Sequence, residues 1–174
     1  MEPAPTVSRP ALMPDGTDAA FRAMVHDTLA FAARIEEVRR LFGELIDLSA
    51  SSYTLLITVR HLQKQDGVSV SEAATHLHLS GSAVTIEANR LSKLGLVTRH
   101  PDPQDRRRVL LRVTPLAEAR LRQLAPVQAQ ANDALFACLD AEGFRRFAGT
   151  MRGLVGCAED ALGILEHATR RKAG

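Results

Sequence analysis

The stretch SVSEAATHLHLSGSAVTIEANRLSKLG, residues 69–95, decides the fold. It opens with a capping box, in which Ser69 is followed three residues later by Glu72, and this pairing predicts a short helix. After a brief turn, Ser80 is placed to cap a second helix. Gly95 follows the last turn of that helix, where a residue with positive φ is favoured. The pattern therefore predicts two helices joined by a tight turn.

After Gly95 the spacing of apolar residues changes from about 3.6, which is typical of a helix, to 2, which is typical of a β-strand. LVTR at 96–99 leads outward and VLLRV at 109–113 leads back. Between them, PDPQDRR at 101–107 has the residues of a polar turn. These signals predict a two-stranded β-hairpin after the two helices. With a further helix over 51–65, residues 49–114 are predicted to form a winged helix-turn-helix domain in a mainly α protein.

The hairpin region is strongly basic, although the whole chain is not. Residues 90–112 contain seven Lys or Arg residues and two Asp residues, a net charge of +5, whereas the full chain carries +2. The rest of the chain is therefore mildly acidic. A cationic segment on such a body favours a polyanionic partner that meets one face. A solvated basic loop is the alternative interpretation.

Amphipathic helices are predicted on both sides of this domain. Residues 1–17 hold four of the eight prolines and are predicted to form a mobile N-terminal arm. Residues 18–48 repeat apolar side chains every three to four positions, which predicts a long helix capped near Asp18. Residues 115–170 are predicted to form C-terminal helices with an apolar stripe at 144–165. A compact monomer would leave these stripes uncovered, so both flanks are predicted to build a dimerisation domain.

The composition excludes several classes of protein. The chain has 174 residues, of which 45% are hydrophobic and 24% charged, as in an ordinary globular protein. No apolar run approaches the roughly 20 residues of a membrane span, and the N-terminus has no export-signal pattern, so a cytoplasmic location is predicted. No catalytic triad or phosphate loop is evident, and the two histidines of HLH at 76–78 alone are a weak metal signal. We expect neither enzyme activity nor a metal or other cofactor.

Four stretches of this sequence together resemble the MarR family of bacterial transcription regulators. They are LSASSYTLL at 48–56, SEAATHLHLSGSAVT at 71–85, LSKLGLVTR at 91–99, and the hairpin from Pro101 to Thr114. The resemblance covers about residues 48–120, and the hairpin is its most specific part. It implies a homodimer that binds double-stranded DNA at a pseudo-palindromic operator, most often as a repressor on the bacterial nucleoid. It also implies release of DNA by a small aromatic or phenolic acid.

Ten residues are candidates for contact with DNA, on their size, charge and position in the predicted helix and hairpin and, for Asp105 and Arg107, on the resemblance. On the second short helix and the hairpin these are Ser80, Gly81, Ser82, Thr85, Ala88, Asn89, Arg90, Asp105, Arg106 and Arg107. Arg107 matches the position that reaches the minor groove, and Asp105 matches the residue that orients its guanidinium. A local surface ion pair is the alternative for these two residues. Arg106 is interpreted as a contact to phosphate or to solvent.

Two positions of the recognition helix depart from the family pattern. Ile86 stands where members have a basic residue, and Glu87 stands where an apolar residue is usual. Two roles are open for Glu87. It can accept a hydrogen bond from cytosine N4, or it can pair with Arg90 three residues later.

A ligand site is hypothesised from three residues. Arg22 and His26 are four residues apart on the first helix and can point to one side. Tyr53 opens the second helix and offers a ring with a hydroxyl group, so the three residues are suited to an aromatic carboxylate. The alternative is that Arg22 is solvated, His26 lies on a helix face, and Tyr53 packs with its hydroxyl bonded.

Two other classes of function remain open. Cys138 and Cys157 lie on apolar helix faces, where buried and inert thiols are usual. A thiol-based redox-sensing regulator would need these thiols exposed and with a lowered pKa. A winged helix can also bind another protein without binding DNA. The salt dependence of binding to duplex DNA separates that module from a regulator.

Overall fold

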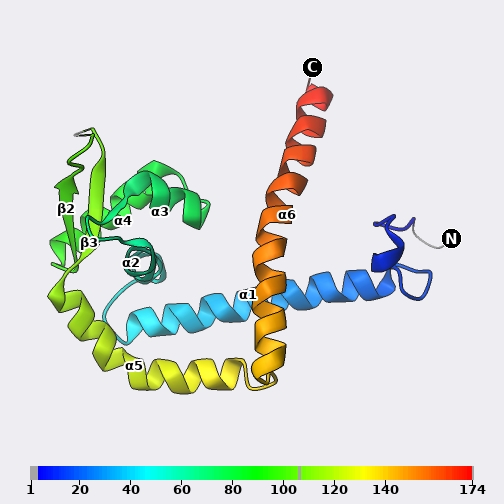
Figure 1. Ribbon diagram of the computed structural model, residues 1–174, viewed down its shortest axis with the longest axis horizontal. Coiled ribbons are helices and arrows are strands. Elements are labelled where there is room, and N and C mark those ends of the chain that lie inside the picture. Colours follow the sequence, from blue (N-terminus) through cyan, green and yellow to red (C-terminus); the bar gives the residue numbers. More distant parts are fainter. Residues whose placement is uncertain (1–3, 106, 174) are drawn as a thin grey trace. The chain divides into compact units, whose positions relative to one another are not determined.

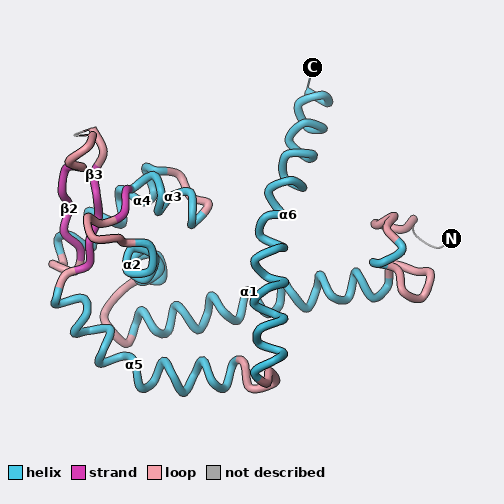
Figure 2. Tube along the Cα trace, viewed as in Figure 1, coloured by secondary structure: helices cyan, strands magenta, loops and turns pink. Residues whose placement is uncertain are grey.

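The computed structural model describes residues 4–105 and 107–173, and Figure 1 and Figure 2 show that most of them are helical. Arg106, one of the predicted DNA-binding residues, lies outside the described residues. The helices are the 3-10 helix η1 (Pro10–Leu12), α1 (Ala19–Glu44), α2 (Ala50–Leu62), α3 (Val70–Leu77), α4 (Gly81–Lys93), α5 (Pro115–Leu135) and α6 (Ala141–Ala173). They belong to two compact units, one that ends at Gln128 and one that begins at Ala129. The prediction of a mainly α protein is confirmed.

The N-terminal arm is tied to the start of α1. Asp18 is the residue before α1, as predicted, but its carboxylate makes no capping bond to the helix. It accepts hydrogen bonds from the backbone N–H of Thr6 at 2.7 Å and the Thr6 hydroxyl at 2.8 Å, and it pairs with Arg22 at 3.1 Å. The bond from the Thr6 N–H is the main reason that the pKa of Asp18 lies below its ordinary value. The arm that the sequence predicted to be mobile therefore has a fixed contact at Thr6.

The chain turns sharply between α1 and α2. α1 ends four residues earlier than predicted, and Asp47 adopts a left-handed φ of 59° in the turn. Ser49 then caps α2 by accepting a hydrogen bond from the N–H of Ser52 at 3.2 Å. α2 lies at the centre of the domain, where Leu56 and Val59 are fully buried.

The packing of α1 against α2 depends on Gly43, which is buried. A Cβ atom at this position would lie 2.9 Å from the carbonyl oxygen of Leu48 and 3.1 Å from Cβ of Tyr53. We expect Gly43→Ala to lower the free energy of unfolding by about 1–3 kcal/mol, because these atoms can yield only if the helices separate. Denaturant unfolding measures the change.

The matched control for Gly43 is Gly149 on α6, where no atom lies within 4 Å of an added Cβ. Gly149→Ala should leave the free energy of unfolding unchanged or raise it by up to about 1 kcal/mol, because alanine favours a helix over glycine. Equal unfolding midpoints for Gly43→Ala and the unmodified protein would contradict this account of the α1–α2 contact.

α3 and α4 form the helix-turn-helix that the capping signals predict. The Ser69 hydroxyl accepts from the N–H of Glu72 at 3.1 Å, and the Glu72 carboxylate accepts from the N–H of Ser69 at 2.9 Å. The Ser69 hydroxyl also donates to this carboxylate, which lowers the pKa of Glu72. His78 turns the chain after α3 with a φ of 52°, Ser80 caps α4, and Gly95 has the predicted positive φ, 69°.

The sheet has three strands, so the prediction of two was incomplete. β2 (Val97–Pro101) and β3 (Val109–Val113) form the predicted antiparallel hairpin. β1 (Val68–Ser69) pairs with the other edge of β3, which gives the order β1-β3-β2. A strand of two residues is too short to show alternation. β1 can approach β3 because the residue before it is Gly67, which has no Cβ atom and a φ of 112°. A Cβ atom at this position would lie 2.7 Å from the carbonyl oxygen of Leu111.

α5 begins as predicted, with the Thr114 hydroxyl accepting a hydrogen bond from the N–H of Ala117 at 3.2 Å. Its first half packs on the domain through Ala117, Leu121 and Leu124. None of the helices in the described part of the chain is both long and apolar enough to cross a membrane.

α6 carries the predicted apolar stripe on a surface that this single chain leaves open. Its exposed large apolar side chains are Phe144, Met151, Leu154, Val155, Leu162, Ile164 and Leu165. Cys157 on α6 is exposed in the chain, as is Cys138 before it. The expectation that both thiols are buried was wrong for the single chain, because the faces on which they lie have no cover within it.

Candidate nucleic-acid interface

α4 has one face in the core and one in solvent. Val84, Ala88 and Leu91 are at most 1% exposed. The prediction that Ala88 faces a groove of DNA was therefore wrong, because its methyl group packs inside the domain. The exposed face carries Ser82, Ile86, Asn89, Arg90 and Lys93.

The first turn of α4 is exposed, but its hydroxyl groups are bonded within the protein. The Ser80 and Ser82 hydroxyls lie 2.9 Å apart, and the Thr85 hydroxyl donates to the carbonyl oxygen of Gly81 at 2.7 Å. Ser80 and Gly81 stand in solvent at the end of the helix where backbone N–H groups favour an anion. The hydroxyl of Thr85 is thus engaged, and its methyl group is the part left to contact a partner.

Glu87 pairs within the protein rather than facing outward. Its carboxylate accepts a hydrogen bond from the buried Ser52 hydroxyl on α2 at 2.6 Å, and it binds the Arg90 guanidinium at 3.1 Å. The Glu87 side chain is 18% exposed. The sequence left two roles open for Glu87, a contact to cytosine and a pair with Arg90, and the structure shows the pair with Arg90. The Ser52 contact, which the sequence did not predict, fastens α4 to α2.

A contact between α4 and β2 joins the recognition helix to the hairpin. The guanidinium of Arg99 on β2 donates to the side-chain oxygen of Asn89 on α4. Sequence reasoning counted Arg99 only as part of the basic segment. Its position on a strand edge beside α4 depends on the hairpin register, in which Arg99 pairs with Leu111.

The tip of the hairpin holds one arginine well out in solvent. The Arg107 side chain is 95% exposed, and its Nε lies 3.5 Å from a carboxylate oxygen of Asp105. The same carboxylate oxygen accepts a hydrogen bond from the backbone N–H of Arg107 at 3.0 Å. Asp105 therefore contacts both the backbone and the guanidinium of Arg107, and its role in orienting the guanidinium toward DNA stays a prediction.

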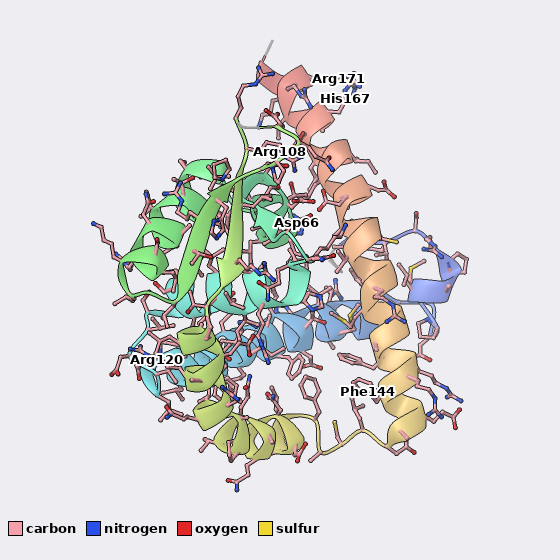
Figure 3. All side chains as sticks on the ribbon, turned by 60° about the vertical axis from the view of Figure 1, so that its left-hand side comes forward. Asp66, Arg108, Arg120, Phe144, His167 and Arg171 are labelled. Atoms are coloured by element: carbon pink, nitrogen blue, oxygen red, sulfur yellow. The ribbon has the colours of Figure 1, made fainter. Side chains whose placement is uncertain are left out.

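Arg108, labelled in Figure 3, lies between the tip of the hairpin and β3 and pairs with two carboxylates. Its guanidinium is 3.7 Å from the carboxylate of Asp102 and 3.6 Å from that of Glu72 on α3. These pairs steady the base of the hairpin, whereas Arg107 extends beyond them.

A groove of about 610 Å³ runs between α3, the start of α4 and the hairpin. Three arginines are among the residues that line it, Arg99, Arg107 and Arg108, together with His78, Ser71, Thr75 and Thr85. Cations and hydroxyl donors around one groove are the groups that bind phosphate oxygens. The groove and the exposed face of α4 form one surface suited to nucleic acid.

A second cavity, of about 940 Å³, lies between α1, α2 and α4. Its wall is largely aliphatic and includes Ile35, Leu55, Leu77 and Val84. Arg40 also lines it, but Glu37 binds that guanidinium at 2.7 and 2.8 Å. Arg39 lines the cavity without an ion pair to another described residue, and its guanidinium carbon lies 5.7 Å from the centre of the Tyr53 ring.

The three residues proposed from the sequence as a ligand site do not meet in the chain. Tyr53 is 1% exposed, and Gln128 donates to its hydroxyl at 3.1 Å. Burial raises the pKa of this hydroxyl. Arg22 pairs with Asp18, and it lies 17 residues before Arg39 on α1, or roughly 25 Å along the helix axis. Arg22, His26 and Tyr53 therefore do not form one pocket within a single chain, and a pocket that they form at the junction of a dimer stays a prediction.

Comparison with known proteins agrees with this architecture. Residues 47–108 match the sequence model of the MarR family. No curated protein matches the chain by sequence.

Solved structures share the fold. The regulator BldR from Sulfolobus solfataricus has a TM-score of 0.64 and 22% identity, over 80% of this chain and 96% of that one. A MarR mutant from E. coli, solved with operator DNA, has a TM-score of 0.61 and 20% identity, over 83% and 96% of the two chains. BpsR from Bordetella bronchiseptica, whose DNA binding is regulated by 6-hydroxynicotinic acid, has a TM-score of 0.60 and 21% identity, over 75% and 91%.

The helix-turn-helix and its hairpin define a winged-helix protein. Residues 47–108, about a third of the chain, are similar to the MarR family, and the solved structures named above share the fold on both sides of this match.

Proposed function

We propose that this protein is a sequence-specific regulator of transcription that binds double-stranded DNA. The observation that carries the proposal is the exposed face of α4, which lies beside the groove lined by arginines. The side chain of Arg107, 95% exposed, extends from the hairpin next to this groove. A helix of this kind fits the major groove, and an arginine at a wing tip suits the narrow and more negative minor groove. Ser80 and Gly81 would meet a phosphate at the start of α4. The site of action is chromosomal DNA in the cytoplasm.

The proposed DNA complex contains two copies of the chain. The exposed apolar side chains of α1 and α6 support a homodimer, because large exposed apolar patches mark surfaces that associate with a partner. Twofold symmetry presents two α4 helices and predicts a pseudo-palindromic operator with half-sites about one DNA turn apart. Repression follows if this operator overlaps a promoter. Sedimentation should give twice the mass of the chain, and a stable monomer at micromolar concentration would contradict the dimer.

Selection from random duplexes tests the proposed function. The full-length protein is incubated with a library of duplexes with a randomised centre, and bound duplexes are amplified and sequenced. We expect an inverted repeat, bound at least about 1,000-fold more tightly than a shuffled duplex of the same composition. Failure to enrich any sequence, with equal affinity for selected and shuffled duplexes, would overturn sequence-specific binding.

The second cavity supports control by a small aromatic acid. Its aliphatic residues suit an aromatic ring, and Arg39 is the lining residue that could pair with a carboxylate in a cavity whose other charged residues are Arg40, Glu36, Glu37 and Glu87. Arg39 takes the role that the sequence assigned to Arg22. A ligand that prefers the form with lower affinity for DNA weakens DNA binding by linkage. The regulation of BpsR by 6-hydroxynicotinic acid is a precedent on a similar fold.

A thermal-shift screen tests this control. Benzoate, salicylate, cinnamate and hydroxynicotinate are added to the full-length protein, with and without the selected duplex. We expect one or more acids to raise the melting temperature of the free protein and to release DNA, and Arg39→Ala to reduce both effects. Arg34→Ala, an exposed arginine of α1 outside the cavity lining, is the matched control. An equal response of both variants would remove Arg39 from the site.

A thiol-based switch is the second candidate for regulation, favoured by the exposure of Cys138 and Cys157 in the chain. Reactive thiols must be accessible and partly ionised. Thiol titration of the native dimer at neutral pH tests this candidate. Thiols that react only after unfolding would end it.

A further inference from the structure

Ile86 is the one large apolar side chain in the middle of the exposed face of α4. It is 61% exposed. It lies four residues after Ser82 and three before Asn89, so the three side chains share one face of the helix. The residues two positions to either side, Val84 and Ala88, are buried, which places Ile86 directly opposite the core. Any surface that receives this face of α4 must therefore contact Ile86.

The polar neighbours of Ile86 are already engaged within the protein. The Thr85 hydroxyl donates to Gly81, the Asn89 side-chain oxygen accepts from Arg99, and the Glu87 carboxylate is held by Ser52 and Arg90. What the face presents at its centre is the branched side chain of Ile86 and the methyl group of Thr85. This favours an apolar feature on the partner.

The charges around Ile86 indicate which partner supplies that feature. Arg99, Arg107 and Arg108 line the groove on one side of α4, and Arg90 and Lys93 continue along the helix. Such a surface attracts a phosphate backbone and holds the helix against it. In the major groove of DNA, the apolar group on a base edge is the C5-methyl of thymine.

We infer that Ile86 is a specificity-determining residue that reads the C5-methyl group of a thymine in each half-site. This inference rests on the proposed DNA-binding function. A basic side chain at this place would favour guanine, whose O6 and N7 accept hydrogen bonds, whereas Ile86 can only exclude water from a methyl group. Isoleucine in place of a basic residue at position 86 therefore shifts the preferred base at the contacted position of the operator from guanine to thymine.

Replacing thymine with deoxyuridine tests the inference, because it removes only the methyl group. The probe is the duplex selected by the full-length protein, with thymines replaced one at a time in both half-sites. We expect one position at which the loss of both symmetric methyl groups weakens binding about 15-fold, or about fourfold for each methyl group. Ile86→Ala should bind the unmodified duplex about 15-fold less tightly and show no further loss with deoxyuridine at that position.

Two further variants sharpen the test. Leu94→Ala removes another exposed apolar side chain at the end of α4, away from this face, and should keep the full deoxyuridine effect. Ile86→Lys should select guanine at the same position when the selection is repeated.

Each outcome decides the inference. A deoxyuridine effect that disappears only in Ile86→Ala supports it. Specific binding that tolerates deoxyuridine at every thymine overturns the inference and leaves the proposed function in place. An Ile86→Ala variant that changes only the response to aromatic acids assigns Ile86 to the adjoining cavity, which it also lines, and overturns the inference. If no duplex is selected at all, the function and the inference both fail.

Discussion

Arg107→Ala should weaken binding to the selected duplex by roughly 100-fold, or about tenfold for each wing of the dimer. The side chain is 95% exposed, and among the described residues its ion pair is with Asp105, so its removal should take away a contact to DNA and little within the protein. The melting temperature of the free protein should therefore stay the same. Fluorescence anisotropy with the labelled duplex measures the affinity, and a thermal scan of the same sample measures the stability.

Arg146→Ala is the control for lost charge. Arg146 on α6 is also exposed and pairs with one acid, Glu142, but it lies outside the winged helix. Its removal should change affinity less than about threefold, since a distant surface charge acts only through a screened field. If Arg107→Ala binds as tightly as Arg146→Ala, the wing does not contact DNA in the way proposed.

Leu91→Ala should lower the free energy of unfolding by about 3 kcal/mol, because Leu91 is fully buried where α4 meets the core. For a chain of this size the melting temperature should fall by roughly 6–12 °C. Affinity for the selected duplex at low temperature should change much less, because Leu91 lies on the face of α4 opposite to DNA. Calorimetry and anisotropy separate the two effects.

Leu94→Ala, three residues later on the same helix, is the matched control. Leu94 is 42% exposed, so its removal should change stability by less than about 0.5 kcal/mol. Equal losses for the two leucines would mean that α4 does not pack on the domain through Leu91.

Local signals made the winged helix predictable. The capping box of Ser69 and Glu72, the Ser80 cap and the positive φ of Gly95 each depend on a few neighbouring residues, and a sequence displays such signals directly. β1 was missed because its two residues show no alternation, and its pairing is set by β3 some 40 residues later.

The site was less predictable wherever a residue's role depends on rotation about α4 or on a distant partner. Ala88 was taken for a groove residue because alanine fits either face of a helix. Ile86 was recognised as a departure from the family but not as the centre of the exposed face. The partner of Glu87 on α2, Ser52, is 35 residues away, so no spacing rule could find it.

The position of Tyr53 was hard to predict for a related reason. The sequence placed Tyr53 at the start of a helix, which left the direction of its ring undefined. In the fold, Phe42 and Arg39 lie against this ring, and Arg39 is also one of the residues that line the cavity. Arg39, and not Arg22, lines the cavity between α1 and α2, which is why Arg39 is the cation that we propose.

The salt dependence of binding tests the central claim most directly. The dissociation constant of the full-length protein for its selected duplex is measured by anisotropy between about 50 and 200 mM salt. Two wings and two α4 helices that neutralise about six phosphates or more should weaken binding by at least about 1,000-fold over this range. An affinity that does not change with salt, or no measurable binding at about 50 mM, would contradict a DNA-binding role and favour a winged helix that binds protein.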